Sequence, residues 1–280
     1  MKIIRSILLL VCISSSLNVF SQSDQISYKW KAPLLTFDIT GFFDIPVGAA
    51  RGNGSSTAVT NGNVSEFFKF NNYGTGLGVG FKIDSKIAVN KKRNFLVYLS
   101  LGFEQIQGDD TLVYISPNTL NGYPLSGSNT YGTYTGSGTS RIVIRNLYAG
   151  LGLEFVYKPD KPISFFIGSD FNLDYLYGFY MELPNITNSY TYYSINGAVR
   201  FGLNFNTGLQ MRITNNIGFL LGFKYHITNL FNKSSSATNN NSMNLLDAAA
   251  PNLNSNLNKD RLISIFQPYL GFSLSFGFKK

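Results

Sequence analysis

The residues of this chain that could do chemistry are few, and they recur at alternate positions of apolar segments. The chain of 280 residues has one histidine, His226, and one cysteine, Cys12. Successive side chains of a β-strand point to opposite faces, so charged residues that alternate with Phe, Leu, Ile and Val are expected to share one face of a sheet. The residues predicted to lie on this face, and so to line the interior of a closed sheet, are Asp38, Lys82, Glu104, Glu154, Asp170, Asp174, Arg200, Lys224 and His226.

These residues allow two kinds of catalytic site. His226 and Thr228 could serve as base and nucleophile if Glu104 or Glu154 oriented the imidazole, because a nucleophile needs a base within hydrogen-bond reach and a third group to hold that base. Asp170 and Asp174 beside His226 would be a protease-like alternative. Both require a geometry that spacing alone does not give. We therefore expect no enzyme, and interpret the nine residues as salt bridges filling the interior, since an unpaired buried charge is costly.

Other sites are not expected. One histidine and one cysteine leave too few ligands for most transition-metal sites. The glycines of 74–80 recur at every second position and no helix follows, so they do not form a phosphate-binding loop. The net charge of +8 is spread over predicted turns rather than along one face, which disfavours a nucleic-acid site. We predict no cofactor, no bound metal and no nucleic-acid partner.

Strict alternation predicts the strands that must position the charged residues. In the last segment Leu270, Phe272, Leu274, Phe276 and Phe278 alternate with Gly and Ser, which indicates a strand with one wholly apolar face. The same pattern predicts eight strands, with ten possible. Their ranges are 33–45, 72–84, 94–107, 141–157, 163–180, 193–212, 217–230 and 262–279.

Two of these strands carry a local feature. In the second, the face opposite the apolar residues carries Gly74, Gly76, Gly78 and Gly80, which would make room for bulky neighbours inside a narrow barrel. In the fourth, the apolar positions change parity midway. We expect either a β-bulge near Arg145-Asn146 or an upper segment that extends beyond the lipid.

The connections between the strands alternate in length. Segments 46–71, 108–140, 181–192 and 231–260 are long, whereas 158–162 and 213–216 are tight turns and 85–93 is shorter than its neighbours. Bacterial outer-membrane barrels have short periplasmic turns and long external loops. The sequence therefore predicts an all-β fold, a closed antiparallel up-and-down transmembrane β-barrel.

Aromatic residues gather at both predicted ends and in one loop. Tyr175, Tyr177, Tyr180, Tyr190, Tyr192 and Tyr193 would border the lipid at one rim, and Phe95, Tyr157, Phe165 and Phe278 at the other.

Tyrosine among Ser, Thr and Gly is a common binding composition. We therefore predict a loop-binding surface within 108–140, made by Tyr114, Tyr123, Tyr131 and Tyr134.

A soluble barrel of lipocalin type is the alternative fold. Its apolar faces would point inward, where eight strands leave only enough room for the side chains that fill the interior. Eight faces of Phe, Leu and Ile would crowd that space, whereas the glycine-rich faces fit it. The sequence favours the membrane barrel.

The N-terminus predicts export. Lys2 and Arg5 precede the apolar segment 7–13, which has the length of a signal peptide and is too short to span a membrane as a helix. We expect residues 1–21 to be cleaved and residues 22–280 to form a single outer-membrane β-barrel domain.

The chain resembles the outer-membrane β-barrel family of Gram-negative bacteria, most specifically in its closing strand, 267–278. That strand is similar to the aromatic-rich signal read by the barrel-assembly machinery, although Lys279 and Lys280 follow it. The resemblance implies insertion in the outer membrane and contact with lipid and lipopolysaccharide. It implies no single activity. We expect the protein to be a monomer. We expect a structural or interaction role presenting external loops. The alternatives are a narrow channel for small or hydrophobic solutes, and a lipid-modifying or proteolytic enzyme.

Overall fold

The structure, a computed structural model, describes residues 29–48, 76–107, 111–115, 136–184, 191–233, 242–243 and 262–278. All of its strands belong to one compact unit, Lys31–Lys280. Residues 1–21 lie outside the described residues, so the signal peptide stays a prediction. Among the described residues, no helix has the length and apolar character needed to cross a membrane.

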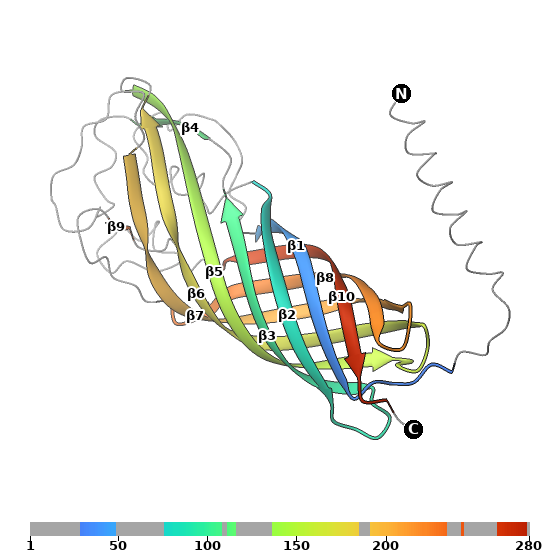
Figure 1. Ribbon diagram of the computed structural model, residues 1–280. Coiled ribbons are helices and arrows are strands. Elements are labelled where there is room, and N and C mark those ends of the chain that lie inside the picture. Colours follow the sequence, from blue (N-terminus) through green and yellow to red (C-terminus); the bar gives the residue numbers. More distant parts are fainter. Residues whose placement is uncertain are drawn as a thin grey trace, which may run out of the picture. The chain divides into compact units, whose positions relative to one another are not determined.

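Eight long strands of the described chain form one closed antiparallel ring (Figure 1). Each strand pairs with the next long strand along the chain, and the first pairs with the last, so the ring has no free edge. Closure gives the backbone its hydrogen bonds where a bilayer could not. The strands are β1 (Leu35–Val47), β2 (Gly78–Ala88), β3 (Phe95–Gln107), β5 (Gly136–Tyr157), β6 (Ile163–Pro184), β7 (Thr191–Arg212), β8 (Ile217–Phe231) and β10 (Ser264–Phe276).

Two short strands are added outside this ring. β4 (Thr111–Ile115) pairs with the beginning of β5, and β9 (Ser242–Met243) pairs in parallel with β7. Both lie in segments predicted as loops, and β5 itself begins within the predicted loop 108–140. β5, β6 and β7 are each 22 residues long and extend past the shorter strands at the end of the barrel that carries the long connections (Figure 1).

The predicted strand count and the predicted alternation of loops are confirmed. The three short connections join β2 to β3, β5 to β6 and β7 to β8, at the end where β1 begins and β10 ends. The predicted end of the second strand was wrong, because β2 continues past Asp84 to Ala88. Ile87, exposed like Ile83, carries the apolar alternation on through this stretch.

The two faces of the ring are sorted as predicted, with apolar side chains outward and polar side chains inward. On β10, Leu270 is 66% exposed and Phe272 57%, whereas Ser273 is fully buried. The apolar positions of this strand run from Phe266 to Phe276. At about 3.3 Å per residue and a tilt of about 40°, that stretch is roughly 25 Å high, the height of the lipid-facing band of an outer-membrane barrel.

Aromatic rings border the apolar surface at both ends. Toward the long connections, Tyr175 and Tyr177 stack with ring centroids 5.5 Å apart. At the end with the short turns, Phe95 packs edge-on against Phe155 at 5.4 Å, and Tyr157 and Phe165 are exposed nearby. This arrangement agrees with the predicted rims as far as they are described. At the rim near the long connections, four of the predicted tyrosines have side chains that the structure does not describe, namely Tyr180, Tyr190, Tyr192 and Tyr193.

Glycines on the inner face make room for aromatic rings. Gly80 lies against the ring of Phe42, and Gly102 lies against the ring of Tyr148. A Cβ atom at either glycine would overlap the ring it faces, and in each case the ring comes from a neighbouring strand. The predicted function of the glycines in β2 is therefore confirmed at Gly80, while Gly74 lies outside the described residues.

The bulge predicted near Arg145-Asn146 is absent. The pairing of β5 with β3 and with β6 is regular through both residues. The change of parity has another cause: Ile144 stays on the inner face and is fully buried in the interior. Register shifts occur instead in the pairing of β6 with β7, after Leu176, and in that of β7 with β8, after Phe201.

Replacing Gly102 with Val should destabilise the barrel by about 1–3 kcal/mol, because the new side chain must displace the Tyr148 ring from a packed interior. Gly41→Val is the matched control, since a Cβ at Gly41 meets nothing within 4 Å and should change stability by about 0.5 kcal/mol or less. Urea unfolding in lipid vesicles measures both. Equal losses for the two variants would show that the inner glycines do not serve ring packing.

Candidate functional site

The candidate site is the interior of the barrel, where all nine polar residues predicted for the inner face are found. Each of them is at most 4% exposed. They come from seven strands, and β10 adds the buried Gln267. The structure does not gather them into one site but into clusters along the barrel axis. The nine are Asp38, Lys82, Glu104, Glu154, Asp170, Asp174, Arg200, Lys224 and His226.

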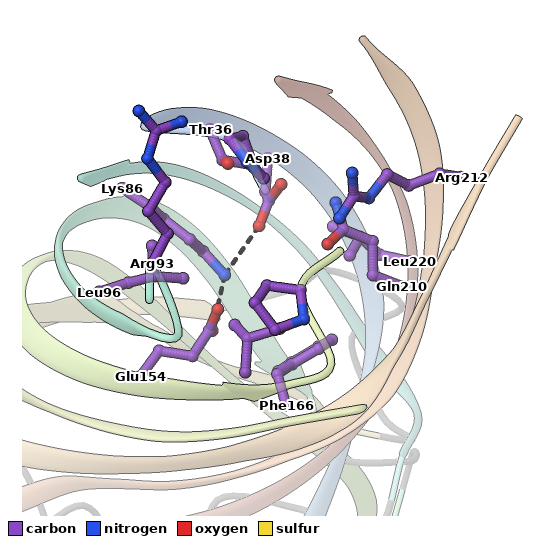
Figure 2. A pocket seen from close by; sticks show the side chains of 13 residues that line it. Thr36, Asp38, Lys86, Arg93, Leu96, Glu154, Phe166, Gln210, Arg212 and Leu220 are labelled. Carbon is purple, nitrogen blue, oxygen red and sulfur yellow. Dashed lines mark hydrogen bonds and ion pairs between the residues drawn. The ribbon is translucent and has the colours of Figure 1, made fainter. Parts of the chain in front are cut away.

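The cluster nearest the short turns is centred on Lys86 of β2. Its Nζ lies 2.8 Å from Asp38 Oδ2 and 2.6 Å from Glu154 Oε2. One ammonium group thus bridges carboxylates from β1 and β5, across the interior (Figure 2). All three side chains are buried, so this pairing is what allows their charges to stay there.

A second cluster lies at the middle of the barrel. Lys82 Nζ is 2.7 Å from Asp84 Oδ2, and Ser100 donates to the other oxygen of Asp84 at 2.7 Å. The Tyr98 hydroxyl donates to Asp170 Oδ2 at 2.9 Å. The buried carboxylates of Asp84 (β2) and Asp170 (β6) therefore accept hydrogen bonds from side chains of β2 and β3.

Lys224 of β8 reaches across the interior to aromatic residues. Its Nζ donates to the Tyr148 hydroxyl at 2.8 Å and lies 4.6 Å from the ring centroids of both Tyr148 and Phe42. A desolvated ammonium over two aromatic faces is stabilised by their quadrupoles. The two rings are those that Gly102 and Gly80 admit, so the glycine positions decide where this charge can lie.

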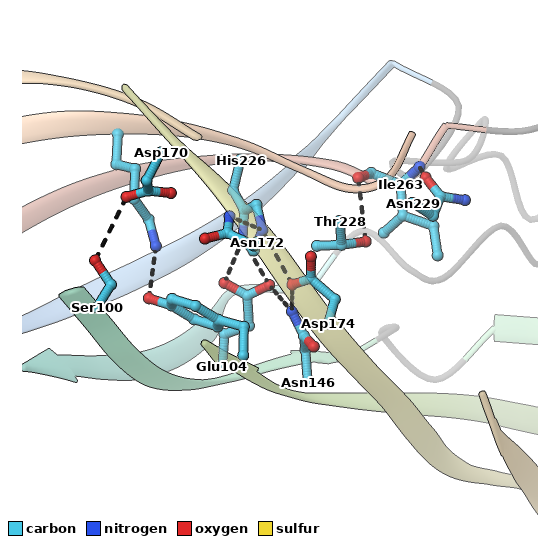
Figure 3. Close-up of polar contacts among 12 residues, drawn as sticks. Ser100, Glu104, Asn146, Asp170, Asn172, Asp174, His226, Thr228, Asn229 and Ile263 are labelled. Atoms are coloured by element: carbon cyan, nitrogen blue, oxygen red, sulfur yellow. Dashed lines mark hydrogen bonds and ion pairs between the residues drawn. The ribbon is translucent and has the colours of Figure 1, made fainter. Parts of the chain in front are cut away.

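The cluster toward the long connections is centred on His226. Its Nδ1 is 3.0 Å from Glu104 and its Nε2 is 3.2 Å from Asp174 (Figure 3). In the imidazolium form, the ring donates to both carboxylates. The Asn146 amide donates to the same two groups, at 2.9 Å to Glu104 Oε1 and 2.6 Å to Asp174 Oδ1. Gln267 ties β10 into the cluster by donating to Glu104 Oε2 at 2.7 Å.

A layer of apolar side chains covers the His226 cluster on the side of the long connections. On four strands, the next inward-facing position toward the long connections is a fully buried aliphatic residue. On β3 and β6, whose chains run toward the long connections, Ile106 follows Glu104 and Leu176 follows Asp174. On β10 and β5, whose chains run the other way, Ile265 precedes Gln267 and Ile144 precedes Asn146. The interior therefore changes from polar to apolar over one side-chain level.

At the other end, a small pocket opens below Lys86. It is lined by side chains that include Thr36, Gln210 and Arg212 (Figure 2), and its volume is about 20 Å³. A cavity needs about 10–15 Å³ to hold one water, so the pocket has room for one water-sized molecule and not for a solute. Arg93 and Arg212 donate to the carbonyls of Ala32 and Lys31, at 2.7 Å each, and hold the segment before β1 beside this mouth.

The catalytic pairs considered from the sequence are only partly assembled. Glu104 does contact His226, but Glu154 lies in the Lys86 cluster. The Thr228 hydroxyl donates to the Ile263 carbonyl at 3.4 Å, while the described polar contacts of the histidine are with other residues (Figure 3). A threonine–histidine nucleophile is therefore not formed in this geometry, and His226 is fully buried away from the lipid-facing surface.

The same cluster is the one group of described residues with a possible metal-ligand set. Donor atoms of Glu104, Asp174 and His226 lie within 4.8 Å of one another. Each residue already has hydrogen-bond partners in the cluster, so an ion would have to displace both contacts of the imidazole. We therefore treat these residues as part of the polar network.

Sequence reasoning missed several members of the network. Asp84 and Asp44 have the inward parity of their strands and could have been found by extending the pattern from Lys82 and Asp38. Lys86 was missed because the second strand was ended too early. Arg200 is buried, as predicted for the inner face, and lies opposite Asp174 in the register of β6 and β7.

The predicted loop-binding surface is mostly outside the described residues. Tyr114 lies in β4, opposite Ser137 of β5, and the position of its side chain is not part of the description. Tyr123, Tyr131 and Tyr134 lie outside the described residues. Binding by these loops stays a prediction.

No protein-family model matches the chain, and no curated protein matches it. Among solved structures, the chain is similar to Neisserial surface protein A, with 9% identity, 86% of this chain and 97% of that chain covered, and a TM-score of 0.43. It is similar to a major outer membrane protein of Thermus thermophilus, with 12% identity, coverages of 86% and 99%, and a TM-score of 0.41. It is also similar to the attachment invasion locus protein Ail of Yersinia pestis, in complex with the heparin analogue sucrose octasulfate, with 10% identity, coverages of 86% and 99%, and a TM-score of 0.36. These scores are too low to carry the assignment, which depends on the strand register of the chain itself. By that register the protein is a closed eight-stranded antiparallel up-and-down β-barrel, the architecture of the small outer-membrane barrel proteins that its sequence resembles.

Proposed function

We propose that the protein is an integral outer-membrane β-barrel with a structural or interaction role, which anchors long external loops in the membrane. The observation that carries this proposal is the inverted distribution of side chains. Within the apolar band, the lysine, aspartate, glutamate and histidine side chains are buried, while Leu, Ile and Phe are exposed around the whole ring. Such a molecule is stable only where its surroundings are less polar than its interior.

The exposed apolar surface disfavours a soluble barrel. Soluble monomers rarely expose contiguous apolar patches larger than a few hundred Å², whereas here every long strand contributes exposed apolar side chains. The band height of roughly 25 Å and its aromatic borders fit a bilayer. A lipocalin-type barrel would need the opposite facing of each strand, that is, a shift of one residue along every strand.

The filled interior favours an anchor over a channel. A solute would have to pass the aliphatic layer at Ile106 and Ile144, the imidazole of His226 between two carboxylates, and the Lys86 ion pairs. The Lys86 and His226 levels are closed by ion pairs between side chains of different strands, and the aliphatic level is filled by fully buried side chains. Eight strands leave only enough room for such filling.

Placement in the outer membrane is supported by the predicted signal peptide, the closed barrel and the aromatic closing strand. Spanning barrels of this kind have short turns in the periplasm and long loops outside. The proposal therefore places the β2–β3, β5–β6 and β7–β8 turns in the periplasm. It includes outer-membrane lipid and lipopolysaccharide as surroundings, the barrel-assembly machinery during biogenesis, and a monomeric state.

Reconstitution tests the anchor against the channel. The folded protein should float with phospholipid vesicles, and should give no resolved conductance in planar bilayers, because its interior is closed at three levels. A variant with Ile144→Ala, His226→Ala and Lys86→Ala should conduct, since it removes bulk from each of those levels. Flotation with steady wild-type conductance would support the channel instead, and failure to float would reject a membrane barrel.

Replacing His226 separates a structural from a catalytic role. His226→Ala should cost about 3–5 kcal/mol, because it removes the ring that lies between two buried carboxylates and leaves them only neutral donors such as the Asn146 amide. A second change, Glu104→Gln, should recover part of this loss by removing one of those charges, which urea unfolding can measure. Lipopolysaccharide acylation should be the same with both variants as with the wild type. Loss of an acyl-chain-removing activity in His226→Ala, with folding intact, would contradict a structural role.

A further inference from the structure

Basic side chains gather on one side of the rim that carries the short turns. Lys91 and Lys92 lie in the β2–β3 turn, Lys158 and Lys161 lie in the β5–β6 turn, and all four are exposed. The two turns are neighbours around the ring, because β3 pairs with β5, and the Val156 amide donates to the Asn94 carbonyl at 2.8 Å just above them. We call these four lysines the basic rim.

The charges near the basic rim leave it strongly positive. Asp160 is the acidic residue of these two turns, and it is exposed between Lys158 and Lys161. Arg93 is turned inward and donates to the Ala32 and Gly277 carbonyls at 2.7 and 2.6 Å. Four lysines therefore face one aspartate on the solvent side of the described turns.

The turn on the opposite side of the same rim has no charged side chain of its own, and the basic residues beside it are Arg212, which is buried, and Lys31, which is half-buried. The β7–β8 turn runs through Thr214, Asn215 and Asn216, and its polar groups bind backbone: Asn216 donates to the Ser275 carbonyl at 2.9 Å and Asn215 accepts from the Lys31 amide at 3.1 Å. Phe219 of β8 stands above this turn and packs on Phe272 of β10. At this end the barrel thus has a strongly basic side, with four exposed lysines, and a weakly basic side.

The basic rim lies directly beneath lipid-facing aromatic residues. Lys158 Nζ is 5.0 Å from the ring centroid of Tyr157, and Tyr157 pairs in register with Phe165. Phe95 and Phe155 complete this group of rings. Aromatic side chains with lysines beside them mark the level of lipid headgroups. At that level an ammonium meets phosphate groups, and an anionic headgroup adds attraction that a zwitterionic one lacks.

We propose that the basic rim is a binding surface for anionic phospholipid headgroups in the leaflet next to the short turns, and that lipid around the barrel is consequently asymmetric. This inference depends on the proposed membrane location and adds to it the lipid class and the side of the barrel. Acidic lipids collect along β2, β3, β5 and β6 more than along β8 and β10.

Quenching of a single tryptophan by brominated lipids tests the proposal. The chain has one tryptophan, Trp30, so Trp30→Phe gives a background in which Phe165→Trp reports on the basic rim. Phe219→Trp reports on the weakly basic side as the matched control. The barrel is placed in mixed phosphatidylglycerol and phosphatidylcholine bilayers in which one or the other lipid is brominated. The Phe165→Trp reporter should prefer phosphatidylglycerol roughly tenfold, and the Phe219→Trp reporter should show a clearly smaller preference.

Charge variants identify the cause of that preference. Changing all four lysines to Gln should bring the Phe165→Trp ratio to about one, changing them to Arg should keep it, and raising the salt concentration should reduce it. Equal quenching by both lipids at Phe165→Trp would overturn the inference while leaving the membrane barrel in place. Quenching by neither lipid at either reporter would overturn the membrane barrel itself. Loss of the preference in sodium phosphate, but not in sodium chloride of equal ionic strength, would assign the surface to free phosphate instead.

Discussion

The structure depends on closing a hydrogen-bonded ring of strands whose outer surface is apolar. In hydrocarbon, each unpaired backbone group costs several kcal/mol, so pairing β1 with β10 is what allows the other strands to face lipid at all. Once the ring is closed, the period of two along each strand decides which side chains face lipid and which face the interior. Every outward position is apolar or small within the band, and each inward position must fit a narrow interior.

The filling of that interior follows from size and charge. Glycines face aromatic rings, the rings place Lys224, and Lys86 and His226 each join two carboxylates from different strands. A buried ion pair adds little net stability over an apolar pair, but removing one partner is strongly destabilising. The network is therefore better understood as fixing the register of the strands and sealing the lumen than as a reaction centre.

The sequence was sufficient for the eight long strands, their facing and the loop alternation, because a period of two is a local signal. It missed the end of β2 and the short strands β4 and β9. It placed Asp38, Glu104 and His226 correctly inside, since parity depends only on position along a strand. It could not predict which charges meet. Glu104 and Glu154 share a parity yet belong to different clusters, because the stagger between strands sets their height. Of the two explanations offered for the parity change at Ile144, the bulge was wrong, since an aliphatic layer inside the barrel gives the same pattern.

The facing of the strands is tested most directly by site-directed spin labelling along β10 in a Cys12→Ser background. Single cysteines from Leu270 to Phe276, labelled in vesicles, report contact with oxygen dissolved in lipid and with a water-soluble nickel reagent. We expect oxygen accessibility to peak at Leu270, Phe272, Leu274 and Phe276 and to fall at the residues between them. A pattern of the opposite phase, or one with no period of two, would contradict a barrel with its apolar face in lipid.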